Sequence, residues 1–406
     1  MLLTLAPLVL ALSSAPAALA PPTALADFVV PAGTTQVYDT LQGPIVVDTF
    51  RIEPGAVLKV VGPKPLRIEA KLLVEIDGLL DLSGGHAANV ATLGTGNQPE
   101  LGAAGSAGGG QGGAGSWLTT TSTPAGGAGF GGFQVLLGGG TGGESGFGAG
   151  SIPSWRPAGG GGGALGPDLP LQAQPGLVGI LAQDGEDGST QATGAMLGLQ
   201  PPQGGQRGAG AFVDGDPTND FWGLRLDPLL GVLIQGELQR PRPGVGGGAG
   251  GDGVPAASFP HPFWQPATDK KGCGGGGGGG LGLIEGRVVR IGPGGAIHAD
   301  GGDGGRGELQ TAFSVAGGGS GGGSGGYLVI QGRNIDLSQA GPDCLSAVGG
   351  RGGEGVSGAG STSAGGDGGA GVVQLHTFGP AGVLLPAGTS LADLSVPDAH
   401  LLLPVL

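Results

Sequence analysis

The chain has 406 residues, of which 100 are glycine and 32 are proline, and 31 acidic against 17 basic residues give a net charge of −14. The glycines follow no strict Gly-X-Y period, which excludes a collagen triple helix, while 38% apolar residues in compact runs still allow a buried core. An acidic chain with scattered basic residues also excludes a nucleic-acid-binding protein, because phosphate contacts need clustered lysines and arginines.

The first 26 residues have the features of a secretory signal peptide. Leu2 to Leu12 form an apolar stretch, small residues follow, and the A-x-A motif Ala24-Leu25-Ala26 precedes Asp27. The segment departs from the usual pattern because no Lys or Arg precedes the apolar stretch. No later apolar run approaches the ~20 residues of a membrane-spanning helix. We therefore expect an exported protein, secreted or at the cell surface, with no membrane span after signal cleavage.

Three similar segments along the chain predict stacked β-structure. Each contains an apolar run, a small residue followed by a basic one, a second alternating run, a turn, and a short third run that ends in Gly-Gly. The segments are 66–85, 281–302 and 327–350, and their small and basic pairs are Ala70-Lys71, Gly286-Arg287 and Gly332-Arg333. The runs are rich in Val, Ile and Leu, which favours strands.

These repeats predict an all-β protein, a parallel β-helix or solenoid with three short strands in each coil. One coil cannot bury its inward face alone, whereas stacked coils can. A β-sandwich of antiparallel hairpins is the alternative, although it would favour two-residue turns of the Asn-Gly type. The expected parts are a signal peptide (1–26), N-terminal coils (27–85), a glycine-rich insertion with aromatic and apolar knots (86–280), C-terminal coils with glycine-rich excursions (281–390), and a tail (391–406).

The glycine tracts allow two structures. Glycine loses more conformational freedom on folding than any other residue, which favours flexible loops. Alternatively, the tracts run extended and bond side by side through their bare backbones, in a bundle of the polyglycine II type. We favour the ordered bundle because the tract 274–280 leads directly into an apolar run at Leu281, whose strand must enter its coil in a fixed register.

All four tryptophans lie in the insertion, and they have two possible roles. Each ring buries a large area and could pin a loop to the body, which is the simpler interpretation. Together they could instead form a surface on which sugar rings stack. The four residues are Trp117, Trp155, Trp222 and Trp264.

Acidic residues and cysteines suggest few other sites. Oxygen ligands in a turn suit calcium, the only cofactor that the sequence suggests. The EF-hand pattern fails, however, at Asn219 and Arg225, so a surface turn is the simpler interpretation. Export also permits one disulfide between Cys273 and Cys344. The candidate calcium ligands are Asp214, Asp216 and Asp220.

The sequence lacks the usual signatures of an enzyme. It contains no HExxH or CxxC motif. Asp300, Asp303 and Arg306 could approach Arg333 and Asp336 on adjacent coils, as in enzymes that act on acidic polysaccharides. Aspartates that follow glycine in turns are the simpler interpretation, so we expect no catalytic residues.

Several stretches together resemble a group of glycine-rich exported proteins of planctomycete-type bacteria. They are "FRIEPGAVLKVVGPKPLRIEA", "KGCGGGGGGG", "IHADGGDGGRG", "GGGSGGGSGGYLVIQG" and "GVVQLHT", and the likeness covers most of the mature chain. The group has no assigned activity, so the resemblance implies export and a solenoid but no catalytic residues. At the level of the fold alone, the coils also resemble those of pectate-lyase-like β-helices. A shared fold does not imply a shared function.

We therefore expect an exported, non-enzymatic structural or adhesive protein of the cell surface or extracellular matrix. The alternative is an extracellular β-helix protein that binds or cleaves polysaccharide. In either case the expected partner is a cell-surface or extracellular polysaccharide.

Overall fold

The computed structural model describes fifteen stretches of the chain, counting the single residue Asp216 as one. They are residues 25–90, 100–115, 126–133, 139–143, 146–147, 159–165, 203–212, 216, 218–226, 231–251, 253–254, 271–310, 315–355, 363–377 and 382–402. The predicted signal peptide up to residue 24, three of the four tryptophans and Asp214 lie outside these stretches. Within them, no helix has both the length and the apolar character needed to cross a bilayer.

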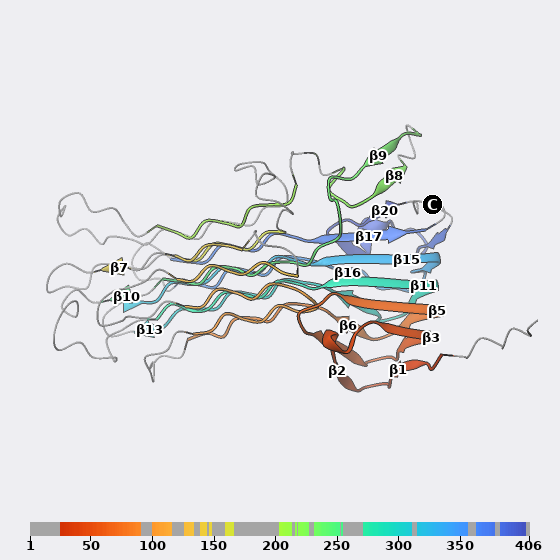
Figure 1. The fold of residues 1–406 in the computed structure, drawn as a ribbon, viewed down its shortest axis with the longest axis horizontal. Coiled ribbons are helices and arrows are strands. Elements are labelled where there is room, and N and C mark those ends of the chain that lie inside the picture. The colour runs from red at the N-terminus through yellow and green to blue at the C-terminus, as the bar shows by residue number, and fades with distance from the viewer. Residues whose placement is uncertain are drawn as a thin grey trace, which may run out of the picture.

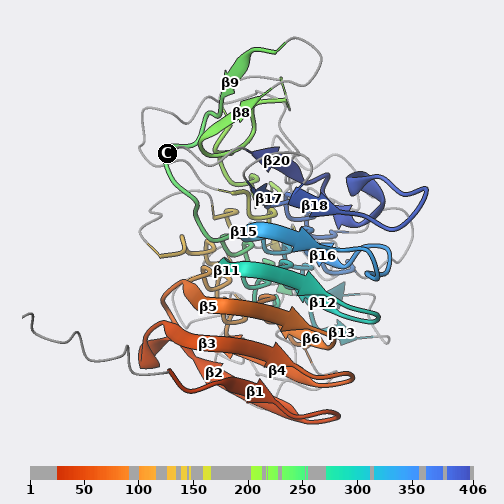
Figure 2. The ribbon, with the colours of Figure 1, turned by 90° about the vertical axis from the view of Figure 1, so that its right-hand side faces the viewer.

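Two parallel sheets form the body of the molecule (Figure 2). Sheet A has the strand order β1-β3-β5-β11-β15-β17-β20, with β18 also beside β15, and sheet B has the order β19-β16-β12-β6-β4-β2. Their strands are β1 Phe28–Val30, β2 Thr35–Asp39, β3 Ile45–Ile52, β4 Val57–Val61, β5 Leu66–Ile76, β6 Leu79–Asp81, β11 Leu281–Ile291, β12 Ala296–His298, β15 Tyr327–Asp336, β16 Leu345–Ser346, β17 Val372–His376, β18 Val383–Leu384, β19 Ser395–Val396 and β20 His400–Leu402. Up to β16 the strands of the body alternate between the two sheets. Each successive pair of strands therefore adds one strand to sheet A and one to sheet B.

The predicted solenoid of short strands is wrong. The central strands of sheet A are long, since β5 and β11 have 11 residues each and β15 has 10. The first two predicted runs of each repeat are one continuous strand, and the register between β5 and β11 merely shifts between Gly286 and Val288. A small residue followed by a basic one therefore does not end the strand: β5 has one extra residue there beside β11, a bulge, whereas β11 and β15 pair without a shift. The parallel pairing of both large sheets also rules out the antiparallel sandwich.

The predicted stacking of the three repeats is confirmed by the strand register. Val74 pairs with Val289, which pairs in turn with Ile335, and Ile76 pairs with Ile291. All five side chains are fully buried in one core. Sheet B closes that core from the other side, with Leu58, Leu80, Ile297 and Leu345.

The expected C-terminal tail contributes strands to both sheets. Within the segment 391–402, β19 pairs with β16 in sheet B and β20 pairs with β17 in sheet A. Leu394 and Leu402 are buried. The last described residues therefore extend the stack by a further layer.

The glycine-rich segments form a bundle that extends away from the sheets (Figure 1). They leave sheet B after β6, β12 and β16, and they return directly into β11, β15 and β17 of sheet A. At the far end lie β7 (Gly146–Phe147), β10 (Gly253–Val254) and the hairpin of β13 (Leu309–Gln310) and β14 (Val315–Ala316). The glycine bundle consists of residues 82–90, 101–115, 126–132, 139–143, 159–165, 203–208, 244–251, 271–280, 299–308, 317–326, 347–355 and 363–371.

Backbone hydrogen bonds link the segments of the bundle with a period of three residues. Along the tract 275–280, three successive N–H groups donate to three different neighbouring segments. The fourth N–H donates to the same segment as the first. This period is expected of extended chains with three residues per turn. The bonds run from Gly275 to Gly113 and Gly278 to Gly110, from Gly276 to Gly321 and Gly279 to Ser324, and from Gly277 to Gly85 and Gly280 to Leu82. The tract is thus ordered and bonded on several sides.

The close approach of these backbones requires glycine. At each of residues 274–280, an added Cβ would lie closer than 3.0 Å to an atom of a neighbouring segment. Most of those atoms are carbonyl oxygens, which cannot move without breaking their own hydrogen bonds. The glycine content is therefore a packing requirement of the bundle.

Candidate functional site

Polar side chains form a regular pattern on one face of the bundle. The sequence "DGGDGGRG" places Asp300, Asp303 and Arg306 three residues apart, and three residues make one turn of the extended chain. The two neighbouring segments show the same spacing. We call this set the polar face, and it consists of Ser83, His86, Asn89, Asp300, Asp303, Arg306, Arg351, Glu354 and Asp367.

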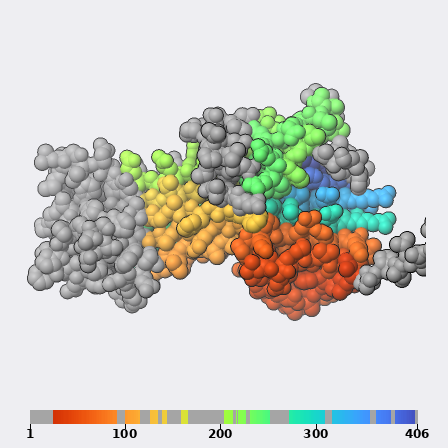
Figure 3. Space-filling view, viewed as in Figure 1, coloured from red at the N-terminus to blue at the C-terminus, as the bar shows by residue number. Residues whose placement is uncertain are grey.

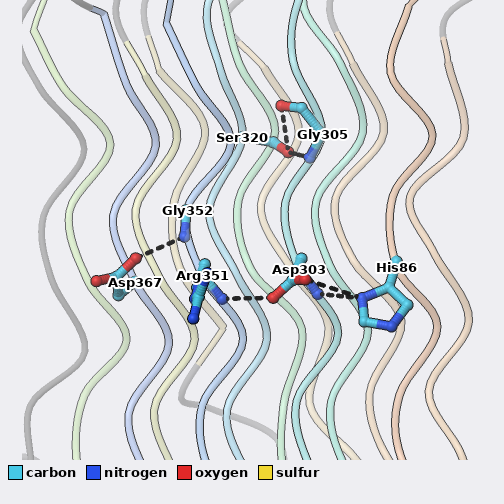
Figure 4. A network of polar contacts seen from close by, with 7 residues as sticks. All are labelled: His86, Asp303, Gly305, Ser320, Arg351, Gly352 and Asp367. Atoms are coloured by element: carbon cyan, nitrogen blue, oxygen red, sulfur yellow. Dashed lines mark hydrogen bonds and ion pairs between the residues drawn. The ribbon is translucent and has the colours of Figure 1, made fainter.

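Side chains of the polar face accept hydrogen bonds from backbone N–H groups of adjacent segments (Figure 4). The N–H of Asp303 donates to His86 Nδ1 over 3.1 Å, and the N–H of Arg351 donates to Asp303 Oδ1 over 2.8 Å. The N–H of Gly352 donates to Asp367 Oδ1 over 2.6 Å. Further bonds run from Asp300 N to Ser83 Oγ, from Val348 N to Asp300 Oδ1, and from Arg306 N to Asn89 Oδ1.

These bonds have a structural origin. In the segment 300–306, which lies at the surface of the bundle, the N–H groups of Asp300, Asp303 and Arg306 point away from neighbouring backbones and meet side chains instead. Such a group needs another acceptor, and the side chain of the adjacent segment supplies it. The His86 and Asp303 side chains also approach within 3.2 Å, but they are 70% and 48% exposed, so this contact contributes little. The polar face thus closes the edge of the hydrogen-bond network.

The predicted cluster of Asp300, Asp303 and Arg306 with Arg333 and Asp336 is divided between two parts of the molecule. The two aspartates bond to the segment that follows β16. Asp336 instead lies on β15 of sheet A, directly opposite Arg290 of β11. The carboxylates therefore serve their own local contacts.

Trp222 is held against the outer face of sheet A. Its N–H lies 3.0 Å from Gln374 Oε1 and 3.1 Å from Tyr327 Oη, and its carbonyl accepts a bond from Gln374 Nε2. Its ring lies 5.7 Å from the ring of His376, centroid to centroid. Gln374 and Tyr327 are fully buried beneath it. These contacts fix the loop that carries Trp222 to the sheet, as in the simpler interpretation of the tryptophans. Trp117, Trp155 and Trp264 lie outside the described residues.

A cavity of about 430 Å³ lies beside this loop, between it and β20. Its lining includes Asp220, Arg225, Asp398 and His400. Its volume falls in the range of small-molecule sites. Burial lowers the pKa of His400 to about 4, and the nearby Arg225 acts in the same direction. Burial likewise lowers the pKa of His376 to about 4, so both imidazoles are neutral at pH 7.

The candidate calcium ligands have other contacts. Asp216 Oδ1 accepts the N–H of Thr218 over 3.0 Å, and hydrogen bonds from Thr218 lower the pKa of this carboxyl group. Asp220 is buried, and Asp214 lies outside the described residues. Across the stretches that the structure describes, no three His, Cys, Asp or Glu side chains are grouped so as to hold a metal ion.

Both cysteines are free, and the disulfide considered from the sequence is not formed. Cys273 is buried in the bundle, where its thiol bonds to the carbonyl of Gly305. Cys344 is buried in the core between the sheets, where its thiol bonds to the carbonyl of Leu394. Burial raises the pKa of each thiol to about 11, which keeps both protonated.

Comparisons of the chain with protein-family models, with curated proteins and with solved structures find no match. No relative's chemistry therefore bears on this chain. Its function has to follow from the bundle, its polar face, the cavity and the sheets.

Proposed function

We propose that the protein is an exported structural or adhesive component of the cell surface or extracellular matrix, with no enzymatic role. The observation that carries this proposal is the glycine bundle. Ordering so many glycines opposes folding, because each loses more backbone freedom than any other residue. What the chain gains is a dense array of extended segments that continues two parallel sheets.

The construction of the bundle supports a mechanical role. Each central segment is bonded on several sides, and at most of its glycines a neighbouring carbonyl group leaves no room for a Cβ atom. Bending one segment would therefore strain hydrogen bonds to several neighbours at once. The polar face adds side-chain bonds where backbone partners are missing. Such an array resists deformation in a way that flexible glycine loops would not.

The elongated shape supports a role in presentation. The sheets occupy one end of the molecule and the bundle carries the chain away from them (Figures 1 and 3). The short strands β7, β10, β13 and β14 are consequently held at the end remote from the sheets. A rigid spacer of this kind suits a surface or matrix component that must hold two contacts apart.

Localisation and genetic rescue test this proposal. Protease treatment of intact cells should remove the protein, and its deletion should weaken cell cohesion under flow without changing the release of soluble glycan fragments. The parent gene and a Gly341→Ala variant should restore cohesion, because a Cβ at Gly341 meets open space. A variant with Gly275, Gly277 and Gly279 changed to Ala should not. A cytoplasmic protein, or altered glycan release, would contradict the proposal.

A further inference from the structure

The small and basic pairs of the three repeats meet in the middle of sheet A. Ala70 pairs with Gly286, which pairs with Gly332, so the basic residues that follow them lie on three adjacent strands. These residues are Lys71, Arg287 and Arg333, and all three are exposed on the outer face of the sheet. Neighbouring strands are ~4.8 Å apart, which sets the spacing between successive cations. We call this set the basic row.

A second row on the same strands shows how the sheet neutralises charge elsewhere. Arg51, Glu75, Arg290 and Asp336 pair in register across β3, β5, β11 and β15, so the signs alternate. The Glu75 carboxylate is 2.6 Å from Arg51 Nε and also bonds to Arg290. Alternation of this kind is favourable between strands, whereas like charges directly opposite one another are destabilising.

The basic row is not neutralised in this way. Lys71 Nζ lies 3.7 Å from Asp48 Oδ1, but neither Arg287 nor Arg333 has an ion-pair partner among the residues that the structure describes. The nearest acidic row contains Glu69 and Glu285, and the Glu69 carboxylate is bonded to Arg67. Arg287 and Arg333, two like charges on adjacent strands in a chain of net charge −14, thus form an unfavourable arrangement that no ion pair within the described residues offsets.

We propose that the basic row binds an anionic polysaccharide, a linear chain bearing carboxylate or sulfate groups that crosses β5, β11 and β15 (Figure 2). Guanidinium groups bind such oxyanions through paired hydrogen bonds. Cations on successive strands meet anionic groups on successive sugar units of an extended chain. A nucleic acid is disfavoured because it is held through many phosphate contacts by clustered lysines and arginines, and the row offers three cations. This inference rests on the proposed extracellular role and names the chemistry of its partner.

Binding of dextran sulfate, with uncharged dextran as the reference, tests the basic row. Calorimetry at about 0.05 M salt should show binding of dextran sulfate alone, and binding should weaken at about 0.5 M salt because charge interactions are screened. Arg287→Gln with Arg333→Gln should lower the affinity at least about tenfold. The matched control is Lys59→Gln with Lys64→Gln, which removes two exposed charges that lie outside the strands of sheet A and should change affinity less than about threefold.

The outcomes separate this site from general charge attraction. Circular dichroism confirms that each variant is folded, and Arg287→Lys with Arg333→Lys should restore part of the affinity. The proposal is overturned if the parent fails to bind dextran sulfate at low salt, or if the control pair weakens binding as much as the arginine pair. Tighter binding of single-stranded DNA than of dextran sulfate also overturns it. None of these results would change localisation or cell cohesion. The structural role is therefore tested separately from the binding of polysaccharide.

Discussion

Adding methyl groups inside the tract 274–280 tests whether the bundle is packed. The variant changes Gly275, Gly277 and Gly279 to Ala, which places three Cβ atoms on alternate residues. Each Cβ would lie inside van der Waals contact of a carbonyl oxygen in a different segment. Those oxygens belong to Gly247, Ala104 and Ala299, respectively.

The size of the effect follows from two opposing contributions. Overpacking of a well-packed interior costs about 1–3 kcal/mol for each site, which gives about 3–9 kcal/mol for three sites in contact with different segments. Alanine also reduces the freedom of the unfolded chain, which favours folding by about 0.4–1 kcal/mol for each site. The midpoints of these two ranges leave an expected net loss of about 4 kcal/mol, a large part of the ~5–15 kcal/mol that stabilises a typical domain.

Urea unfolding followed by circular dichroism measures this loss. The matched controls are Gly210→Ala and Gly341→Ala, because nothing lies within 4 Å of a Cβ at either position. Each control should be neutral or more stable by up to about 1 kcal/mol. A triple variant as stable as the parent would refute the packed bundle and leave the glycines as a tether.

Four further predictions concern the core, the histidines, the polar face and the N-terminus. Ile291→Asp places an unpaired charge in the core and should lower the free energy of unfolding by several kcal/mol, against about 1 kcal/mol for Ile291→Val, in the same urea assay. Because burial lowers the pKa of His376 and His400 to about 4, the unfolded chain takes up protons before the folded one as pH falls from about 6.5 to 4. Stability should therefore drop over that range by up to about 3 kcal/mol for each histidine, and changing both to Gln should flatten the profile. Asp303→Ala should cost about 1 kcal/mol because a backbone donor loses its acceptor, whereas Asp303→Asn should behave like the parent. N-terminal sequencing of the native protein should show cleavage directly after Ala26, and an uncleaved chain would disprove the signal peptide.

The stacking of the repeats could be predicted because their apolar patterns repeat. Val74, Val289 and Ile335 occupy the same place in three similar segments, and alternation fixes which side chains face inward. A shared inward face can be buried only if the segments stack. The register therefore followed from the sequence even across the long insertion.

The number of strands in each repeat could not be predicted in the same way. At Gly286 and Arg287 the alternation breaks, and a turn and a bulge interrupt a sequence pattern alike. Only the hydrogen bonds that continue from Gly286 to Val288 distinguish them, and these depend on the neighbouring strand. For this reason the sequence predicts short strands where the structure has long ones.

The polar face was missed although a signal for it was present. The spacing of Asp300, Asp303 and Arg306 by two glycines is the three-residue period of the bundle. Which group each carboxylate bonds depends on the order of the segments, since His86 and Arg351 are far from Asp303 in sequence. The pinning of Trp222 by Gln374 depends on tertiary packing in the same way.

Hydrogen–deuterium exchange of the glycine tracts tests the central claim most directly, because amide protection reports the free energy of local opening. Mass spectrometry of peptides from 271–280 and 317–326 would compare their amides with those of β11 and β15. The ordered bundle predicts protection of the tracts that approaches that of these strands, with exchange over hours. Complete exchange of both tracts at the rate of an unstructured chain, while β11 and β15 stay protected, would contradict the account.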